Sequence, residues 1–116
     1  MLGHAEAKQC SLRSRYKLEM RFIMQIKRLR LIQELTGGYN DRGNVYCILD
    51  KMDKALLDYN KAIKLKKDFS MAYNNRGNAY LILSKKKEAL QDFISAIKYD
   101  KTNTKAYRNE LDFMFQ

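Results

Sequence analysis

The most constraining feature of this 116-residue sequence is an internal repeat of 34 residues. When residues 36–69 are laid over residues 70–103 without a gap, 16 of the 34 positions are identical. Unrelated segments would share only about two positions by chance. A repeat of this length is one supersecondary unit that buries its apolar face by stacking on its own copy, so the sequence predicts a repeat array.

Composition narrows the class of the repeating unit. The chain contains no proline and only five glycines, whereas sandwiches and barrels need frequent Gly and Pro turns between short strands. Apolar residues make up 46% of the sequence, which is enough for a folded core, and no uncharged apolar run reaches the ~18 residues of a membrane span. These features favour an all-α protein without a transmembrane helix.

Each 34-residue unit is predicted to form two helices. In the first unit these span residues 39–49 and 53–65, with the polar Asp50 and Lys51 in the turn and Asp53 as the N-cap of the second helix. The second unit repeats the design over residues 73–83 and 87–99. The apolar stripe of the second helix follows helical spacing and comprises Ala55, Leu56, Tyr59, Ala62 and Ile63.

Small residues predict close packing within each hairpin. Gly43 and Gly77 lie inside the first helices, where glycine costs about 1 kcal/mol relative to alanine unless the missing side chain is needed. Alanines recur seven residues apart on the second helices, and Tyr39, Tyr46 and Tyr59 are expected to fill the gaps beside them. The sequence thus predicts antiparallel helical hairpins that stack on each other.

The residues at these positions make the sequence similar to the tetratricopeptide repeat family. The motif residues in the two units are Tyr39, Gly43, Tyr46, Ala55, Tyr59 and Ala62, then Tyr73, Gly77, Tyr80, Ala89, Phe93 and Ala96. The resemblance covers residues 36–103 and implies tandem helix-turn-helix units in a short right-handed superhelical stack with flanking capping helices. It also implies a non-catalytic scaffold that binds proteins. The sequence departs from the family at Asp50 and Ser84, which replace a turn glycine, and at Leu111, which stands where a third repeat would have glycine.

The two ends lie outside the complete repeats. Residues 1–15 have no apolar period and are predicted to be a flexible tail, with a mitochondrial presequence as a minor alternative because Glu6 interrupts it. Residues 16–35 are predicted to be a helix that ends at Gly37-Gly38 and packs on the first hairpin in place of a missing repeat. A membrane- or RNA-binding basic helix is the alternative for this segment.

The C-terminal segment, residues 104–116, is predicted to be a partial repeat that ends in a capping helix. Its apolar residues cannot all face inward on one helix, so we expect part of this surface to mediate self-association unless the array continues beyond it. These apolar residues are Leu111, Phe113, Met114 and Phe115.

The sequence provides no recognisable catalytic constellation. Its single histidine, His4, lies in the predicted tail, and its two cysteines, Cys10 and Cys47, are 37 residues apart without further metal ligands. Gly37-Gly38 lacks the lysine of a phosphate-binding loop and is interpreted as a helix break. We expect no enzymatic activity, cofactor or metal, and the low cysteine content favours an intracellular, cytoplasmic location.

A binding groove is the remaining candidate site. Five asparagines lie one helical turn apart on neighbouring first helices, although asparagine is a poor helix former. Their amides could hold the backbone of an extended peptide, and nearby cations could hold an acidic or C-terminal group. The candidate peptide-binding residues are Asn40, Asn44, Asn74, Asn75, Asn78, Lys105 and Arg108.

Part of this set resembles the site with which one variant of the family binds the C-terminal carboxylate of heat-shock chaperones. The similar positions are Asn44, Asn75 and Lys105, whereas Asn40 and Asn109 stand where that site has positive charges. The resemblance therefore implies a peptide groove more readily than tight binding of chaperone tails, because charge-assisted bonds are missing.

The net charge of +10 supports an alternative function. A basic helical repeat could bind RNA or another polyanion. We consider this alternative weaker because the charge is spread over the whole sequence, and because the tyrosines that could stack on bases belong to the repeat's packing motif.

Overall fold

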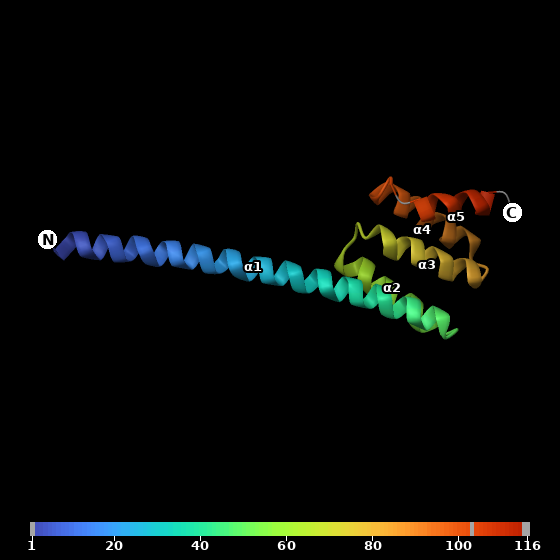
Figure 1. Ribbon diagram of the computed structural model, residues 1–116, viewed down its shortest axis with the longest axis horizontal. Coiled ribbons are helices and arrows are strands. Elements are labelled where there is room, and N and C mark those ends of the chain that lie inside the picture. The colour runs from blue at the N-terminus through green and yellow to red at the C-terminus, as the bar shows by residue number, and fades with distance from the viewer. Residues whose placement is uncertain (1, 103, 115–116) are drawn as a thin grey trace. The chain divides into compact units, whose positions relative to one another are not determined.

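The computed structural model describes residues 2–102 and 104–114, with side chains for residues 12–102, 105–112 and 114. These residues form five α-helices and no strand, which confirms the all-α prediction (Figure 1). The helices are α1 (Leu2–Ile48), α2 (Met52–Leu65), α3 (Ser70–Ile82), α4 (Lys86–Tyr99) and α5 (Thr104–Met114).

The chain divides into two compact units, residues 1–32 and residues 33–116. The first unit is the N-terminal part of α1, so the helix predicted for residues 16–35 is present but begins earlier, at Leu2, inside the predicted tail. The side chains from Leu12 to Leu31 are exposed, and Phe22 has a relative exposure of 64%. The expectation that this segment packs on the first hairpin stays a prediction.

The predicted helix break at Gly37-Gly38 is wrong, because α1 continues through both glycines. Neither glycine has a positive φ, and a Cβ atom added at either position would meet nothing within 4 Å. Helix propagation is cooperative, so a long helix remains continuous even though each glycine destabilises it by ~1 kcal/mol relative to alanine. Packing therefore does not explain the choice of glycine at these two positions.

The second unit contains the helical hairpins, with the C-terminal part of α1 packed on α2. In Figure 1, α2, α3, α4 and α5 lie beside one another, and contacts join α2 to α3, α3 to α4, and α4 to α5. Alanines at the centres of these contacts are fully buried: Ala55, Ala62, Ala72, Ala79, Ala89, Ala96 and Ala106. The predicted hairpin stack is confirmed, and α5 occupies the place of the first helix of a third unit.

The glycines of the repeat explain how the two helices of each hairpin approach. A Cβ atom added at Gly43 would lie 2.6 Å from Cε1 of Tyr59, and one added at Gly77 would lie 2.6 Å from Cε1 of Phe93. Each glycine therefore leaves room for a buried aromatic ring from the opposite helix. Tyr59 is buried and the half-buried Tyr46 packs against the same core, as predicted, and Tyr39 is also half-buried.

The turns between the helices of each hairpin share one geometry. Asp50 and Ser84 have φ values of 59° and 62°, in the left-handed region that favours glycine. The backbone N–H of Lys51 donates to the carbonyl of Tyr46 at 2.8 Å, and that of Asp50 donates to Cys47 at 3.1 Å. Residues 80–85 repeat the pattern, which is a Schellman motif with a non-glycine residue at its left-handed position.

The prediction that Asp53 is an N-cap is wrong by two residues. The N-cap of α2 is Lys51, which makes no side-chain capping bond, and Asp53 lies in the first helical turn. A carboxylate in that turn still interacts favourably with the positive end of the helix dipole.

Candidate functional site

The predicted asparagine row lies on the first helices of the hairpins, and two of its members are buried. The side-chain Nδ2 of Asn75 donates to Oδ1 of Asn40 at 3.0 Å, and Nδ2 of Asn109 donates to Oδ1 of Asn74 at 3.0 Å. Both bonds connect residues 35 positions apart, so they form an amide ladder between successive units. Because Asn40 and Asn74 are buried acceptors in this ladder, their polar groups serve stacking rather than an exposed groove.

The asparagines one turn further along are more accessible. Asn44 and Asn78 are half-buried, and the side-chain carbonyl of each accepts a bond from the protein. The hydroxyl of Tyr59 donates to Oδ1 of Asn44 at 2.6 Å, and Nδ2 of Asn109 donates to Oδ1 of Asn78 at 3.0 Å. Fixing the carbonyl end of an amide also fixes its NH2 end as the donor for an incoming acceptor.

Tyr59 is suited to this role because its environment keeps the phenol protonated. Burial, together with the neighbouring Cys47 and Asp58, raises the pKa of Tyr59 far above its ordinary value. The Sγ atom of Cys47 lies 3.4 Å from the same hydroxyl, so this cysteine is part of the packing around the tyrosine. The ring that fills the space over Gly43 thus also orients Asn44.

The two predicted cations lie on α5, one unit further along the stack. Lys105 and Arg108 are both exposed, and Asn109 beside them makes the ladder contacts to Asn74 and Asn78. The structure therefore brings Asn44, Asn75 and Lys105 onto three successive first helices. Of the seven predicted residues, all but Asn40 and Asn74 have side chains that solvent reaches.

Sequence reasoning missed two ion pairs in which the carboxylate is buried. The guanidinium of Arg42 donates two bonds of 2.7 Å to the carboxylate of Asp58, and Arg76 makes the same bidentate contact with Asp92 at 2.6 and 2.8 Å. Hydrogen bonds and the charge of Asp58 raise the pKa of Arg42. The signal was present in the repeat, because both residues recur unchanged 34 positions later and lie 16 apart in each unit.

The faces of the repeat tyrosines are covered by cations. The guanidinium carbon of Arg42 lies 5.6 Å from the ring centre of Tyr39 and 5.8 Å from that of Tyr46. Lys61 and Lys54 lie over the same two rings at 5.4 and 5.8 Å. Rings occupied in this way are poorly placed to stack on nucleic-acid bases, which weakens the polyanion alternative.

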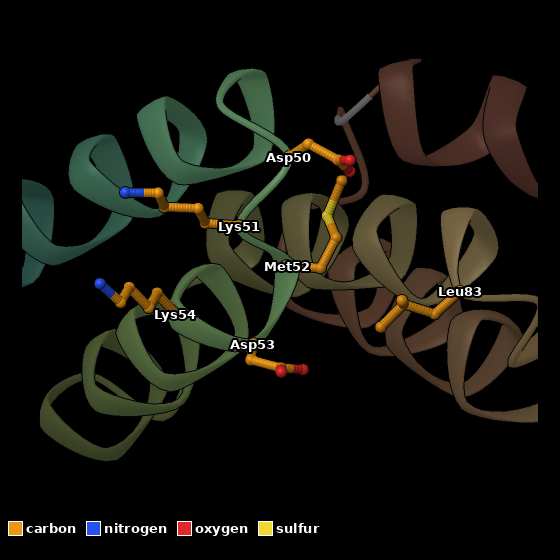
Figure 2. Close-up of a pocket in the computed structure, with 6 residues that line it drawn as sticks. All are labelled: Asp50, Lys51, Met52, Asp53, Lys54 and Leu83. Atoms are coloured by element: carbon orange, nitrogen blue, oxygen red, sulfur yellow. The ribbon is translucent and has the colours of Figure 1, made fainter.

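A separate pocket of about 450 Å³ lies at the turn between α1 and α2. Figure 2 shows that the side chains of Lys51 and Lys54 extend to one side, away from the carboxylates of Asp50 and Asp53, so these groups do not converge on one point. Among the residues the structure describes, no cluster of three or more His, Cys, Asp or Glu side chains could hold a metal ion. In the same part of the chain, no helix is long and apolar enough to cross a membrane.

The stacked hairpins define a helical-repeat protein, and comparison with known proteins gives its family. A family model described as TPR repeat matches residues 43–84, and one described as tetratricopeptide repeat matches residues 70–103. The Arabidopsis OM64 TPR domain is 32% identical, with a TM-score of 0.67 over 71% of this chain and 68% of that one. The chain therefore belongs to the tetratricopeptide repeat family.

Two further solved structures contain a bound peptide. The first TPR of Spaghetti (RPAP3), bound to the HSP90 peptide SRMEEVD, is 28% identical with a TM-score of 0.62 over 66% of this chain and 60% of that one. The second TPR domain of human RPAP3, in complex with the HSP70 peptide SGPTIEEVD, is 29% identical with a TM-score of 0.62, over 66% of this chain and 63% of that one. The chain thus spans less than two thirds of each of these two domains. No curated protein searched matches this sequence.

Proposed function

We propose that this chain is a non-catalytic protein-interaction module that binds the acidic C-terminal segment of a partner protein. The proposal is carried by one observation: Asn44, Asn75 and Lys105 lie on three successive first helices, and Tyr59 holds the carbonyl of Asn44 so that its NH2 group is available as a donor. An extended peptide that crosses the three helices would meet two amides and then a positive charge.

The charge balance favours an acidic ligand. Lys105 and Arg108 are exposed on α5, and the related domains of Spaghetti and human RPAP3 hold peptides that end in EEVD. A terminal carboxylate would accept bonds from the amides while an acidic side chain interacts with either cation. Opposite charges of this kind increase the association rate and set the direction of the bound peptide.

The amide ladder limits how tight this binding can be. Asn40 and Asn109 stand at the two positions where the chaperone-binding site has cations, and both are engaged in contacts between units. Each missing cation removes a charge-assisted bond of about 1.5–3 kcal/mol. We therefore expect weaker affinity than a site with its full set of cations would have, together with strong dependence on salt.

Calorimetric titration with the peptide SRMEEVD tests the proposal. The matched ligand is the same peptide with an amidated C-terminus, which keeps the side chains and removes only the terminal charge. We expect the free acid to bind at least about tenfold more tightly than the amide at low salt. Equal affinity for the two peptides, or no heat with either, would overturn the proposal.

A pair of lysine variants tests whether Lys105 contributes to peptide binding. Lys105→Ala should weaken binding of the free acid by about 1.5–3 kcal/mol, because it removes a charged contact. Lys101→Ala is the control, since Lys101 is an exposed lysine in the turn just before α5. If both variants lose the same affinity, the effect is general electrostatic attraction, and the polyanion alternative becomes the better account.

A further inference from the structure

The N-terminal unit, residues 1–32, consists of the first part of α1 alone. A helix with an apolar face normally buries that face against a second element of its own unit, but a unit made of one helix contains no such element. Ten large apolar side chains among residues 12–31 are exposed. Contiguous apolar surface of this kind marks an interaction site.

The polar side chains in the middle of this segment gather in a narrow stripe, and the apolar ones are spread over a broad arc. The polar stripe comprises Lys17, Arg21, Gln25 and Arg28, which lie within about 80° of one another on the helix. Over residues 16–29 the apolar side chains extend from Leu18 around to Met24, an arc of about 240° that also contains Glu19 and Lys27. A helix that docks in a protein groove or pairs in a coiled coil needs only a narrow apolar stripe. The breadth of the arc therefore favours immersion in an apolar medium over contact with one other helix.

The same segment is strongly basic. Residues 12–32 contain seven Lys or Arg and one acidic residue, Glu19, which forms an ion pair with Arg15 at 3.2 Å. Lys27 and Arg30 lie inside the apolar arc, and their long aliphatic stems allow the charged ends to extend beyond it. Apolar side chains combined with this excess of cations fit an occupant that is both apolar and anionic.

The other candidate occupants do not match both properties. Residues 33–116 contain 15 Lys or Arg against 11 Asp or Glu, so the second unit is itself positively charged. A second copy of the chain brings the same excess of cations. RNA would neutralise the cations but leave the aliphatic side chains in water, because proteins bind bases by aromatic stacking and hydrogen bonds. An anionic lipid bilayer complements the charge and covers the apolar arc together.

We propose that residues 12–32 bind along the surface of an anionic lipid bilayer. Four side chains enter the boundary between headgroups and acyl chains, and the lysines and arginines lie against the lipid phosphates. The immersed side chains are Phe22, Ile23, Ile26 and Leu29, which share the side of the helix opposite the polar stripe. The helix lies on the bilayer and does not cross it, since seven Lys and Arg side chains are too costly to bury in the hydrocarbon.

Flotation of the full chain with lipid vesicles tests the proposal. Vesicles of phosphatidylcholine mixed with phosphatidylserine supply the anionic surface, and vesicles of phosphatidylcholine alone are the reference. We expect the chain to partition into the mixed vesicles at least about tenfold more strongly at low salt. Equal partition into both kinds of vesicle, or no binding to either, would overturn the proposal.

A pair of variants on the same helix separates apolar insertion from attraction by charge. Phe22→Asp places a charge on the immersed side, and Gln25→Asp places the same charge in the polar stripe. We expect Phe22→Asp to partition into the mixed vesicles at least about tenfold more weakly than Gln25→Asp. If the two variants bind equally while Lys17→Gln with Lys27→Gln weakens binding, the helix binds by charge alone, as it would bind RNA, and the proposal is wrong.

The same two variants, measured without vesicles, distinguish lipid from the protein alternatives. We expect them to have the same melting temperature and the same mass at sedimentation equilibrium, because no protein surface covers Phe22. A lower melting temperature for Phe22→Asp alone would mean that this side chain packs on residues 33–116. Loss of a dimer in Phe22→Asp alone would mean that a second copy covers it. Either result would contradict the proposal.

Tryptophan fluorescence tests which side of the helix enters the bilayer. The chain contains no tryptophan, so Ile26→Trp and Gln25→Trp each introduce one reporter, at positions about 100° apart on the helix. With mixed vesicles, we expect the emission of Ile26→Trp to move to shorter wavelength and to be quenched by brominated lipid, whereas that of Gln25→Trp changes little. Equal changes in both variants, or a larger change in Gln25→Trp, would overturn the assignment of the immersed side.

Discussion

The side-chain amide of Asn75 donates to the side-chain carbonyl of Asn40 at 3.0 Å, and one unit later Asn109 repeats this bond to Asn74. An amide is suited to such a ladder because it offers a donor and an acceptor at once. Buried amides without partners would destabilise the stack, so the ladder also fixes the register between hairpins. The asparagines that the sequence assigns to one binding row therefore have two different roles.

Removal of the ladder donor should destabilise the stack. Asn75→Asp replaces the donating NH2 group with an acceptor, so the buried carbonyl of Asn40 loses its partner. We expect a loss of about 1–3 kcal/mol in the free energy of unfolding, measured by urea denaturation. Asp41→Asn is the control, because Asp41 is the exposed residue at the same repeat position. Equal stability of Asn75→Asp and wild type would show that the ladder contributes nothing to stacking.

The close approach at Gly77 predicts opposite effects for two glycine substitutions. Gly77→Leu forces a side chain into the space of the Phe93 ring, and overpacking of this kind costs about 1–3 kcal/mol or more. Gly37→Ala adds a methyl group where nothing lies within 4 Å, so it should stabilise α1 by up to about 1 kcal/mol. Thermal melts followed by circular dichroism measure both changes. If Gly77→Leu and the wild type have the same melting temperature, the contact between the glycine and the aromatic ring does not stabilise the hairpin.

Glycine at the left-handed turn positions should make the protein more stable. Asp50 and Ser84 occupy a conformation that glycine adopts without strain, and neither of the two Schellman motifs requires their side chains. We expect Ser84→Gly to raise the free energy of unfolding by about 0.5–1 kcal/mol. The measurement is urea denaturation, with Ser95→Gly inside α4 as a control that should be destabilising. A loss of stability in Ser84→Gly would mean that the serine side chain has a role in the turn.

Tyr59 gives the fold a sensitivity to alkali. Burial raises its pKa in the folded state, so its contribution to stability is complete below the ordinary tyrosine pKa of about 10 and declines as the pH rises above it. Tyr59→Phe, which copies Phe93 of the second unit, removes this ionisation. Melting temperatures between pH 8 and 11 should therefore fall less steeply for Tyr59→Phe than for wild type. If the melting temperatures of Tyr59→Phe and wild type fall equally steeply with pH, the loss of stability in alkali is caused by the ionisation of other groups.

The sequence predicts the hairpins because their packing depends on residue size at fixed spacing. Gly43, Ala55 and Ala62 recur 34 positions later and Tyr59 is matched there by Phe93, and in the structure each glycine lies against the aromatic ring of its own unit. The break predicted at Gly37-Gly38 was based on local helix propensity and not on packing. The low helix propensity of two glycines favours a break, but the cooperativity of a long helix overrides it. Propensity alone cannot decide between a hinge and a continuous helix at such a position.

The site was harder to predict because burial decides what an amide does. Asn40 and Asn44 look equivalent in the sequence, yet Asn40 is buried under Asn75 whereas Asn44 is half-buried and held by Tyr59. The bidentate partner of Arg42 is 16 residues away on another helix, and neither residue type indicates the pairing by itself. These distinctions arise from the register between helices, which the residue types on one helix do not show.

A titration of 15N-labelled protein with SRMEEVD, followed through the side-chain amide signals of the asparagines, tests whether the peptide binds to the first helices. We expect the Nδ2 signals of Asn44 and Asn75 to shift with peptide concentration, while that of the buried Asn74 stays in place. The backbone signals around Lys105 should shift with the same dissociation constant. Lys85, Lys86 and Lys87 are exposed at the start of α4, a second helix of the repeat. Shifts confined to these three lysines, or an unchanged spectrum at saturating peptide, would contradict the assignment of the peptide site to the first helices.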